Sequence, residues 1–220
     1  MFFWFSHKKY PEFWKHYLKQ FRKKQSKTIE EIKFIIFDTE TTGLNIQEDR
    51  ILSIGAISVR NNIIFVEDSF EVFVKQETYT KNTVEIHGIL KEGIIDKTSE
   101  EKAMELFLNY IENAVLVAHH AAFDIEMINM ALKRMQLPKL KNKFIDTGIL
   151  YKKLEGKKDS LFSLDFLCDE FSVSKHDRHT AAGDAFITAK LFLKILKELK
   201  KQRTIHYSDL FRKPNKKGLL

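Results

Sequence analysis

Two acidic residues, Asp38 and Glu40, stand two positions apart directly after an apolar run at residues 34–37. A run of this length is too short for a helix and predicts a buried strand. Because side chains alternate along a strand, both carboxylates would point to the same side and raise each other's pKa. A hard divalent cation such as Mg²⁺, which prefers carboxylate oxygens, would relieve this repulsion. Taken alone, the pair could also be two solvated acids at the end of a strand.

A third acid, Asp124, follows a second apolar run at residues 114–118, where a strand is expected to give way to a helix. Proteins of the α/β class usually place their sites at this edge of the sheet. The position therefore suits a metal ligand, and it equally suits the N-cap of the helix.

His179 and Asp184 form a third candidate group. Within one ideal helix, two side chains five positions apart lie about 140° from each other and would not easily share a site. If Thr180 caps the helix, His179 lies on the preceding loop and can turn toward Asp184. Gly183 leaves room for another group to approach closely. The alternative is a mobile surface histidine in front of an amphipathic helix.

The elements that must position these residues follow from hydrophobic periodicity. Strands are expected at residues 34–37, about 51–60, about 63–75, 114–118 and 143–146, with Asn61 and Asn62 in a tight turn. Helices are expected at about 10–25, 98–112, 124–136, 163–171 and 180–199. Three neighbouring antiparallel strands, followed by strands that alternate with helices, predict an α/β domain with one mixed sheet and helices on its faces.

The 220 residues are 44% hydrophobic and 30% charged, which is typical of one globular domain with appendages. The single cysteine, Cys168, excludes an intramolecular disulfide and a metal cage made of cysteines alone, and it favours a reducing, cytoplasmic setting. The apolar residues 1–5 are too few for a signal peptide, and no run is long enough to span a membrane.

The net charge of +7 is unevenly distributed. Residues 1–33 carry 9 Lys/Arg against 3 Asp/Glu, and residues 197–220 carry 8 against 2, so the part between the two basic ends is acidic. We therefore divide the chain into a basic aromatic arm at residues 1–32, a central domain at 33–199 and a basic tail at 200–220. The basic ends suit phosphate backbones, although terminal lysines can also simply solvate flexible ends.

The helix expected at residues 10–25 is amphipathic, with Pro11 suited to its first turn. We expect its apolar face to pack on the chain's own domain, with a partner or membrane surface as the alternative. That face consists of Phe13, Trp14, Tyr17, Leu18 and Phe21.

Taken together, the three groups resemble a known family. Asp38-x-Glu40, Asp124 preceded by Phe123, and His179-x4-Asp184 are similar, in order and spacing, to the three motifs of the DEDDh 3′→5′ exonuclease superfamily. The closest likeness is to the epsilon proofreading subunits of bacterial DNA polymerase III and their stand-alone relatives. The resemblance covers about residues 33–197, with supporting segments at 50–56, 86–89, 146–147 and 163–164.

The resemblance implies an RNase H-like fold with a mixed five-stranded sheet, and a two-metal mechanism. Two divalent ions, Mg²⁺ or Mn²⁺, would bridge the scissile phosphate, and His179 would take the proton of the attacking water. His179 must be neutral to do so, which predicts that activity falls in acid. The implied metal ligands are Asp38, Glu40, Asp124 and Asp184.

By the same likeness, the segment after the first motif would grip the terminal nucleotide, with Leu44 wedged against a base. Such stacking and backbone contacts do not read sequence. The implied substrate-binding residues are Thr39, Thr41, Thr42, Gly43, Leu44, His87, His120 and Phe123. The chain departs from the family pattern at His120, where Asn is usual, and at Ser53, where many relatives have Glu. Neither departure touches the four acids, so they bear on substrate preference rather than on catalysis.

The expected partners are single-stranded DNA or RNA 3′ ends. We favour DNA, in a repair or proofreading role; the alternatives are an exoribonuclease that trims RNA and a replication subunit that works mainly through a partner. Tyr207-Ser208-Asp209-Leu210-Phe211 in the tail faintly resembles the segments that bind the bacterial sliding clamp, although it lacks the usual leading Gln. A clamp or polymerase contact through the tail is therefore a further hypothesis.

Overall fold

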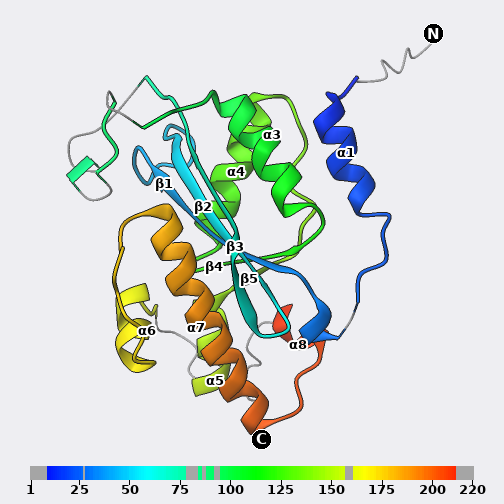
Figure 1. Cartoon of the computed structure of the whole chain (residues 1–220), viewed down its shortest axis with the longest axis vertical. Helices are drawn as coiled ribbons and strands as arrows, with labels where there is room; N and C mark the ends of the chain where they lie inside the picture. The colour runs from blue at the N-terminus through cyan, green and yellow to red at the C-terminus, as the bar shows by residue number, and fades with distance from the viewer. Residues whose placement is uncertain are drawn as a thin grey trace, which may run out of the picture.

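A computed structural model of the chain describes residues 9–26, 28–77, 84–85, 88–91, 95–156 and 161–211. Its centre is a five-stranded sheet in the order β3-β2-β1-β4-β5 (Figure 1). The first three strands pair antiparallel, while β1–β4 and β4–β5 pair parallel, which confirms the mixed sheet expected from the sequence. The strands are β1 (Phe34–Thr41), β2 (Ile51–Arg60), β3 (Ile63–Phe73), β4 (Val115–Ala118) and β5 (Phe144–Asp146).

Helices cover both faces of the sheet (Figure 1). Each face has its own hydrophobic core. The first core packs α1, α3 and α4 on one face, and the second packs α5, α6, α7 and α8 on the other. Their bounds are α1 (Glu12–Gln20), α3 (Glu100–Ile111), α4 (Ala122–Arg134), α5 (Thr147–Glu155), α6 (Leu164–Glu170), α7 (Ala181–Gln202) and α8 (Tyr207–Phe211), with a 3₁₀ turn η1 (Ile29–Glu31) before β1. None of the described helices is long and apolar enough to cross a bilayer.

The helix starts follow the capping residues where the sequence provides them. Ser99, Ser163 and Thr180 each accept a hydrogen bond from a backbone N–H of the first turn of α3, α6 and α7. Two starts differ from expectation. Helix α4 begins at Ala122, so Asp124 lies in its first turn and is not its N-cap. Helix α5 was not expected, because Gly148 in its first turn weakens the helical pattern. The helix starts there because Asp146 caps it, accepting a hydrogen bond from the backbone N–H of Ile149.

The N-terminal helix α1 is built into the domain. Trp14 and Tyr17 are fully buried in the core that α3 and α4 share with the sheet, which confirms that the aromatic face packs on the chain's own domain. The Tyr17 hydroxyl donates to Asn142 Oδ1 at 2.6 Å and accepts from the backbone N–H of Lys141 at 2.8 Å. Helix α1 is thereby tied to the segment that leads into β5.

The C-terminal helix α8 is also packed on the domain. Leu210 is 3% exposed and belongs to the second core. The ammonium group of Lys153 on α5 donates to the carbonyl oxygens of Asp209 and Leu210 at 2.9 and 3.0 Å. The segment that resembles a clamp-binding motif is therefore a short helix whose leucine, Leu210, is covered.

One glycine fixes the approach of α7 to the sheet. Gly55 on β2 is the cross-strand partner of Asp38 on β1. A Cβ at Gly55 would lie 2.2 Å from the backbone of both Ala181 and Ala182, so only glycine allows the start of α7 to come this close. The close approach brings the first turn of α7, and with it Asp184, against β1.

Candidate active site

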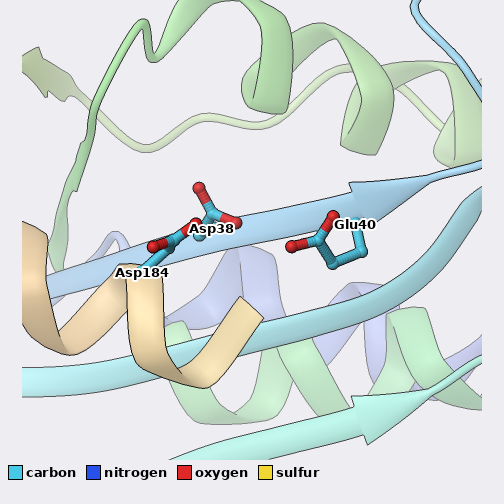
Figure 2. Close-up of side chains that lie close together, drawn as sticks. All are labelled: Asp38, Glu40 and Asp184. Carbon is cyan, nitrogen blue, oxygen red and sulfur yellow. The ribbon is translucent and has the colours of Figure 1, made fainter. Parts of the chain in front are cut away.

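Three carboxylates meet where α7 begins beside β1. Side-chain oxygens of Asp38, Glu40 and Asp184 lie within 4.8 Å of one another. Asp38 and Glu40 extend from the same side of β1, as strand alternation predicts, and Asp184 reaches them from the first turn of α7 (Figure 2).

Asp124 approaches the same region from α4. It is 4% exposed, and its Oδ1 accepts hydrogen bonds from the backbone N–H of Thr39 at 3.0 Å and from the Thr39 hydroxyl at 2.7 Å. Its charge raises the pKa of Asp38, after the larger effect of burial, so the two carboxyls are neighbours. The structure thus brings together three of the four predicted acids in one cluster, with the fourth beside it and held by Thr39.

The cluster carries more negative charge than its surroundings compensate. Burial, followed by the charges of Asp124, Asp184 and Glu40, raises the pKa of Asp38 well above its usual value. Burial and the charge of Asp184 raise the pKa of Glu40 to about 7. Burial also raises the pKa of Asp124 to about 7, although the hydrogen bonds from Thr39 lower it.

The residues fit a divalent cation. Within the described part of the chain, the buried Oδ1 of Asp184 has no hydrogen-bond donor, and an ionised buried oxygen needs a donor or a cation. Mg²⁺ and Mn²⁺ favour carboxylate oxygens arranged in this way. Asp38, Glu40 and Asp184 would hold such an ion, and Asp124 is placed to contribute.

These shifts predict how the stability of the metal-free protein depends on pH. A carboxyl whose pKa is raised by folding stabilises the folded state below its unfolded pKa of about 4, and this contribution is lost as pH rises to about 7. We therefore expect the Tm in EDTA to fall between pH 5 and pH 8, and the increase in Tm caused by Mn²⁺ to be larger at pH 8. Differential scanning fluorimetry at both pH values measures this; a Tm increase that is larger at pH 5 contradicts it.

The loop before α7 places His179 beside the cluster. Thr180 caps α7, so His179 lies outside the helix, as predicted for a histidine free to reach Asp184. Its backbone N–H donates to Asp184 Oδ2 at 3.3 Å, and its side chain is exposed. A Cβ at Gly183 would lie 2.0 Å from the carbonyl oxygen of Asp177, so the room expected at Gly183 is filled by the folded loop.

Arg178 is the residue at this site that the sequence analysis did not identify. Its Nη1 donates to Asp184 Oδ2 at 2.5 Å, while Nε and Nη2 donate to the two carboxylate oxygens of Asp165 at 2.8 and 3.3 Å. The only sequence signal was a cation directly before His179, within a group of acids expected to repel one another.

The segment after β1 is ordered by its own side chains. Thr41 donates to the carbonyl oxygen of Gly43 at 2.7 Å, and Thr42 donates to Asp49 Oδ1 at 2.6 Å. Asp49 also accepts from the backbone N–H of Asn45, and a Cβ at Gly43 would clash with the Asp49 carboxylate. This turn presents Leu44 to solvent at 84% exposure.

The other predicted substrate-binding residues, and Ser53, differ in how far they are buried. His120 is exposed in the left-handed region at φ 58°, and Phe123 is half-buried against the first core. Ser53 is buried opposite Glu40 in the sheet, and its hydroxyl has no partner among the described residues. His87 lies outside the described residues.

A mixed five-stranded sheet with helices on both faces and acids gathered beside its central strand is an RNase H-like architecture. The chain belongs to the exonuclease family: the RNase T family model, described as "Exonuclease", matches residues 35–192. The chain is therefore a nuclease, a hydrolase.

A curated relative agrees with this family, and a solved structure agrees with the fold. The chain is 33% identical over 197 residues to DNA polymerase III subunit epsilon of Buchnera aphidicola, covering 83% of this chain and 81% of that protein. It is 32% identical over 175 residues to DNA polymerase III PolC-type of Thermotoga petrophila, covering 79% of this chain and only 12% of that much longer protein. The solved structure of Exonuclease X in complex with 5′ overhanging duplex DNA superposes with a TM-score of 0.62 at 23% identity, covering 80% of this chain and 96% of that one.

Proposed function

We propose that this protein hydrolyses phosphodiester bonds one nucleotide at a time from the 3′ end of DNA, in a repair or proofreading role. The observation that supports this most directly is the cluster of Asp38, Glu40 and Asp184 on an exonuclease fold. The similarity to an epsilon subunit and to an exonuclease solved with DNA supports DNA as the substrate. The proposal retains the cytoplasmic setting that the single cysteine favours.

The acids would hold two divalent ions, Mg²⁺ or Mn²⁺, through Asp38, Glu40, Asp184 and Asp124. Ions bound there would supply positive charge to the scissile phosphate and make a neighbouring water more acidic. His179, on the capped loop beside Asp184, takes the proton of the attacking water. The backbone N–H and the hydroxyl of Thr39, which lies between Asp38 and Glu40 on β1, hold Asp124 in place.

Binding of the terminal nucleotide is assigned to the ordered turn after β1. The Thr41 and Thr42 hydroxyls tie residues 41–44 to Gly43 and Asp49, which favours one conformation of the turn before substrate binds. The exposed side chain of Leu44 is available to pack against a base, and His120 and Phe123 lie on the loop and helix that carry Asp124. Contacts of this kind grip a strand without reading its sequence.

The test is the degradation of 5′-labelled single-stranded DNA and RNA, side by side, with Mg²⁺, Mn²⁺ or EDTA. We expect a metal-dependent ladder that shortens from the 3′ end and runs faster on DNA. His179→Ala should slow it by about 10²–10⁴-fold and leave the Mn²⁺-induced increase in Tm unchanged, because the histidine moves a proton and holds no metal. Faster digestion of RNA would select the exoribonuclease alternative, and no digestion of either by the folded protein would reject the proposal.

The clamp hypothesis gains no support from the fold. Leu210 is covered by the second core, and Lys153 holds the end of α8, so a clamp could engage this segment only after α8 left the domain. We therefore keep the free-standing nuclease as the proposal. Equal recovery of the sliding clamp by the full chain and by a chain lacking residues 203–220 would remove the clamp idea.

A further inference from the structure

Arg178 links the acidic cluster to an acid outside it. Both oxygens of Asp165 on α6 accept from its guanidinium, and the remaining side, Nη1, donates to Asp184 Oδ2. Arg178 is largely buried, with 16% of its side chain exposed, while Asp165 is 48% exposed. A guanidinium is planar and keeps its charge, so the two nitrogens on one edge, Nε and Nη2, are held by Asp165 while the third, Nη1, is directed at Asp184.

In this geometry the two carboxylate oxygens of Asp184 have different environments. Oδ2 accepts from Arg178 and from the backbone of His179. The buried Oδ1 has no donor within the described residues. Arg178 therefore leaves one oxygen of Asp184 for a cation.

The charge of Arg178 acts on the whole cluster. Burial is the main cause that raises the pKa of both Asp38 and Glu40. The charge of Arg178 lowers both pKa values. Among the ion pairs that the structure describes, Arg178 is the cation that contacts a member of the cluster. The metal-free cluster is thus partly neutralised by the chain itself, and a divalent ion that enters meets a like charge beside Asp184.

We propose that Arg178, anchored by Asp165, is a positioning residue that supplies the compensating positive charge of the metal-free cluster and thereby weakens divalent-ion binding to it. The proposal rests on the divalent-ion site proposed above. Arg178 acts through Asp184 and does not itself ligate metal.

The test measures Mn²⁺ binding by isothermal titration calorimetry at pH 8, and Tm in EDTA and in Mn²⁺, on the full chain without nucleic acid. The variants are Arg178→Gln, which removes the charge, and Arg178→Lys, which keeps it. Lys175→Gln is the matched control, because Lys175 lies on the same loop and pairs with the exposed Asp169 at 2.7 Å, outside the cluster. Arg178→Met repeats the loss of charge while keeping an apolar stem, and it replaces Arg178→Gln if that variant does not fold.

We expect Arg178→Gln to lower the Tm in EDTA, to enlarge the increase in Tm on adding Mn²⁺, and to tighten Mn²⁺ binding by about threefold to tenfold. Arg178→Lys and Lys175→Gln should stay within about twofold of wild type. Weaker or unchanged binding by Arg178→Gln, or tightening by Arg178→Lys or Lys175→Gln as well, would overturn the inference and leave the metal site standing. A wild type that binds no Mn²⁺ would instead reject the metal site of the proposed function, and the inference with it.

Discussion

Asp38→Asn is expected to reduce the rate of 3′→5′ digestion by at least about 10³-fold, while the variant remains folded. Asp38 is the central acid of the cluster: it lies with Glu40 and Asp184 and next to Asp124. Replacing its carboxylate by an amide removes a metal ligand and changes the field at the scissile phosphate, which costs several kcal/mol of transition-state stabilisation.

The same substitution should stabilise the metal-free protein at pH 8. Burial and three neighbouring acids oppose ionisation of Asp38, so a neutral amide of similar shape relieves repulsion. Digestion of labelled single-stranded DNA gives the rate, and scanning fluorimetry in EDTA gives the Tm. Asp96→Asn, at an exposed acid that is not a member of the cluster, is the control and should change neither. A digestion rate within tenfold of wild type would show that Asp38 is not part of the active site.

Gly55→Ala should reduce activity by about 100-fold through a residue that touches no substrate. The new Cβ would lie 2.2 Å from the backbone of Ala181 and Ala182, where ordinary contact requires more than 3.4 Å. The start of α7 must therefore move by about 1 Å, and it carries Asp184 away from Asp38; a misplacement of this size at a reacting centre can cost about 10²-fold. Overpacking of this kind also costs about 1–3 kcal/mol of stability.

Ala56→Val separates the displacement from general destabilisation. Ala56 is the next residue of β2, and its side chain packs in the first core on the opposite face of the sheet from α7. Both variants should lower the Tm, but only Gly55→Ala should lose activity and the Mn²⁺-induced increase in Tm at a temperature where both remain folded. Equal loss of activity in the two variants would show that Gly55 does not position α7.

The sequence predicted those features of the site that depend on residues close together in the chain. Strand alternation placed Asp38 and Glu40 on one side of β1, and the capping role of Thr180 placed His179 outside α7. The order of strands and helices predicted the mixed sheet, because neighbouring hairpins and strand–helix–strand units have few arrangements.

Contacts between distant segments could not be predicted in the same way. Thr39 holds Asp124 across 85 positions of sequence, and nothing near either residue indicates the other. Arg178 reaches Asp184 from a loop in which the carbonyl oxygen of Asp177 lies close to Gly183, and the sequence gives no sign of this loop conformation. Helix α5 depends on its cap at Asp146 and on packing in the second core more than on its own helical pattern.

The docking of α1 has a consequence for synthesis of the chain on the ribosome. Tyr17 bonds to Asn142, which is 125 positions later in the sequence, and Trp14 lies in a core that includes α3 and α4. At a translation rate of about 5–20 residues per second, the aromatic face of α1 has no complete docking surface for roughly 6–25 s after it is made. An amphipathic helix whose aromatic face stays uncovered for that time is a natural target for chaperones that bind nascent chains. We therefore expect the yield of folded enzyme to depend on what protects α1 until Asn142 emerges.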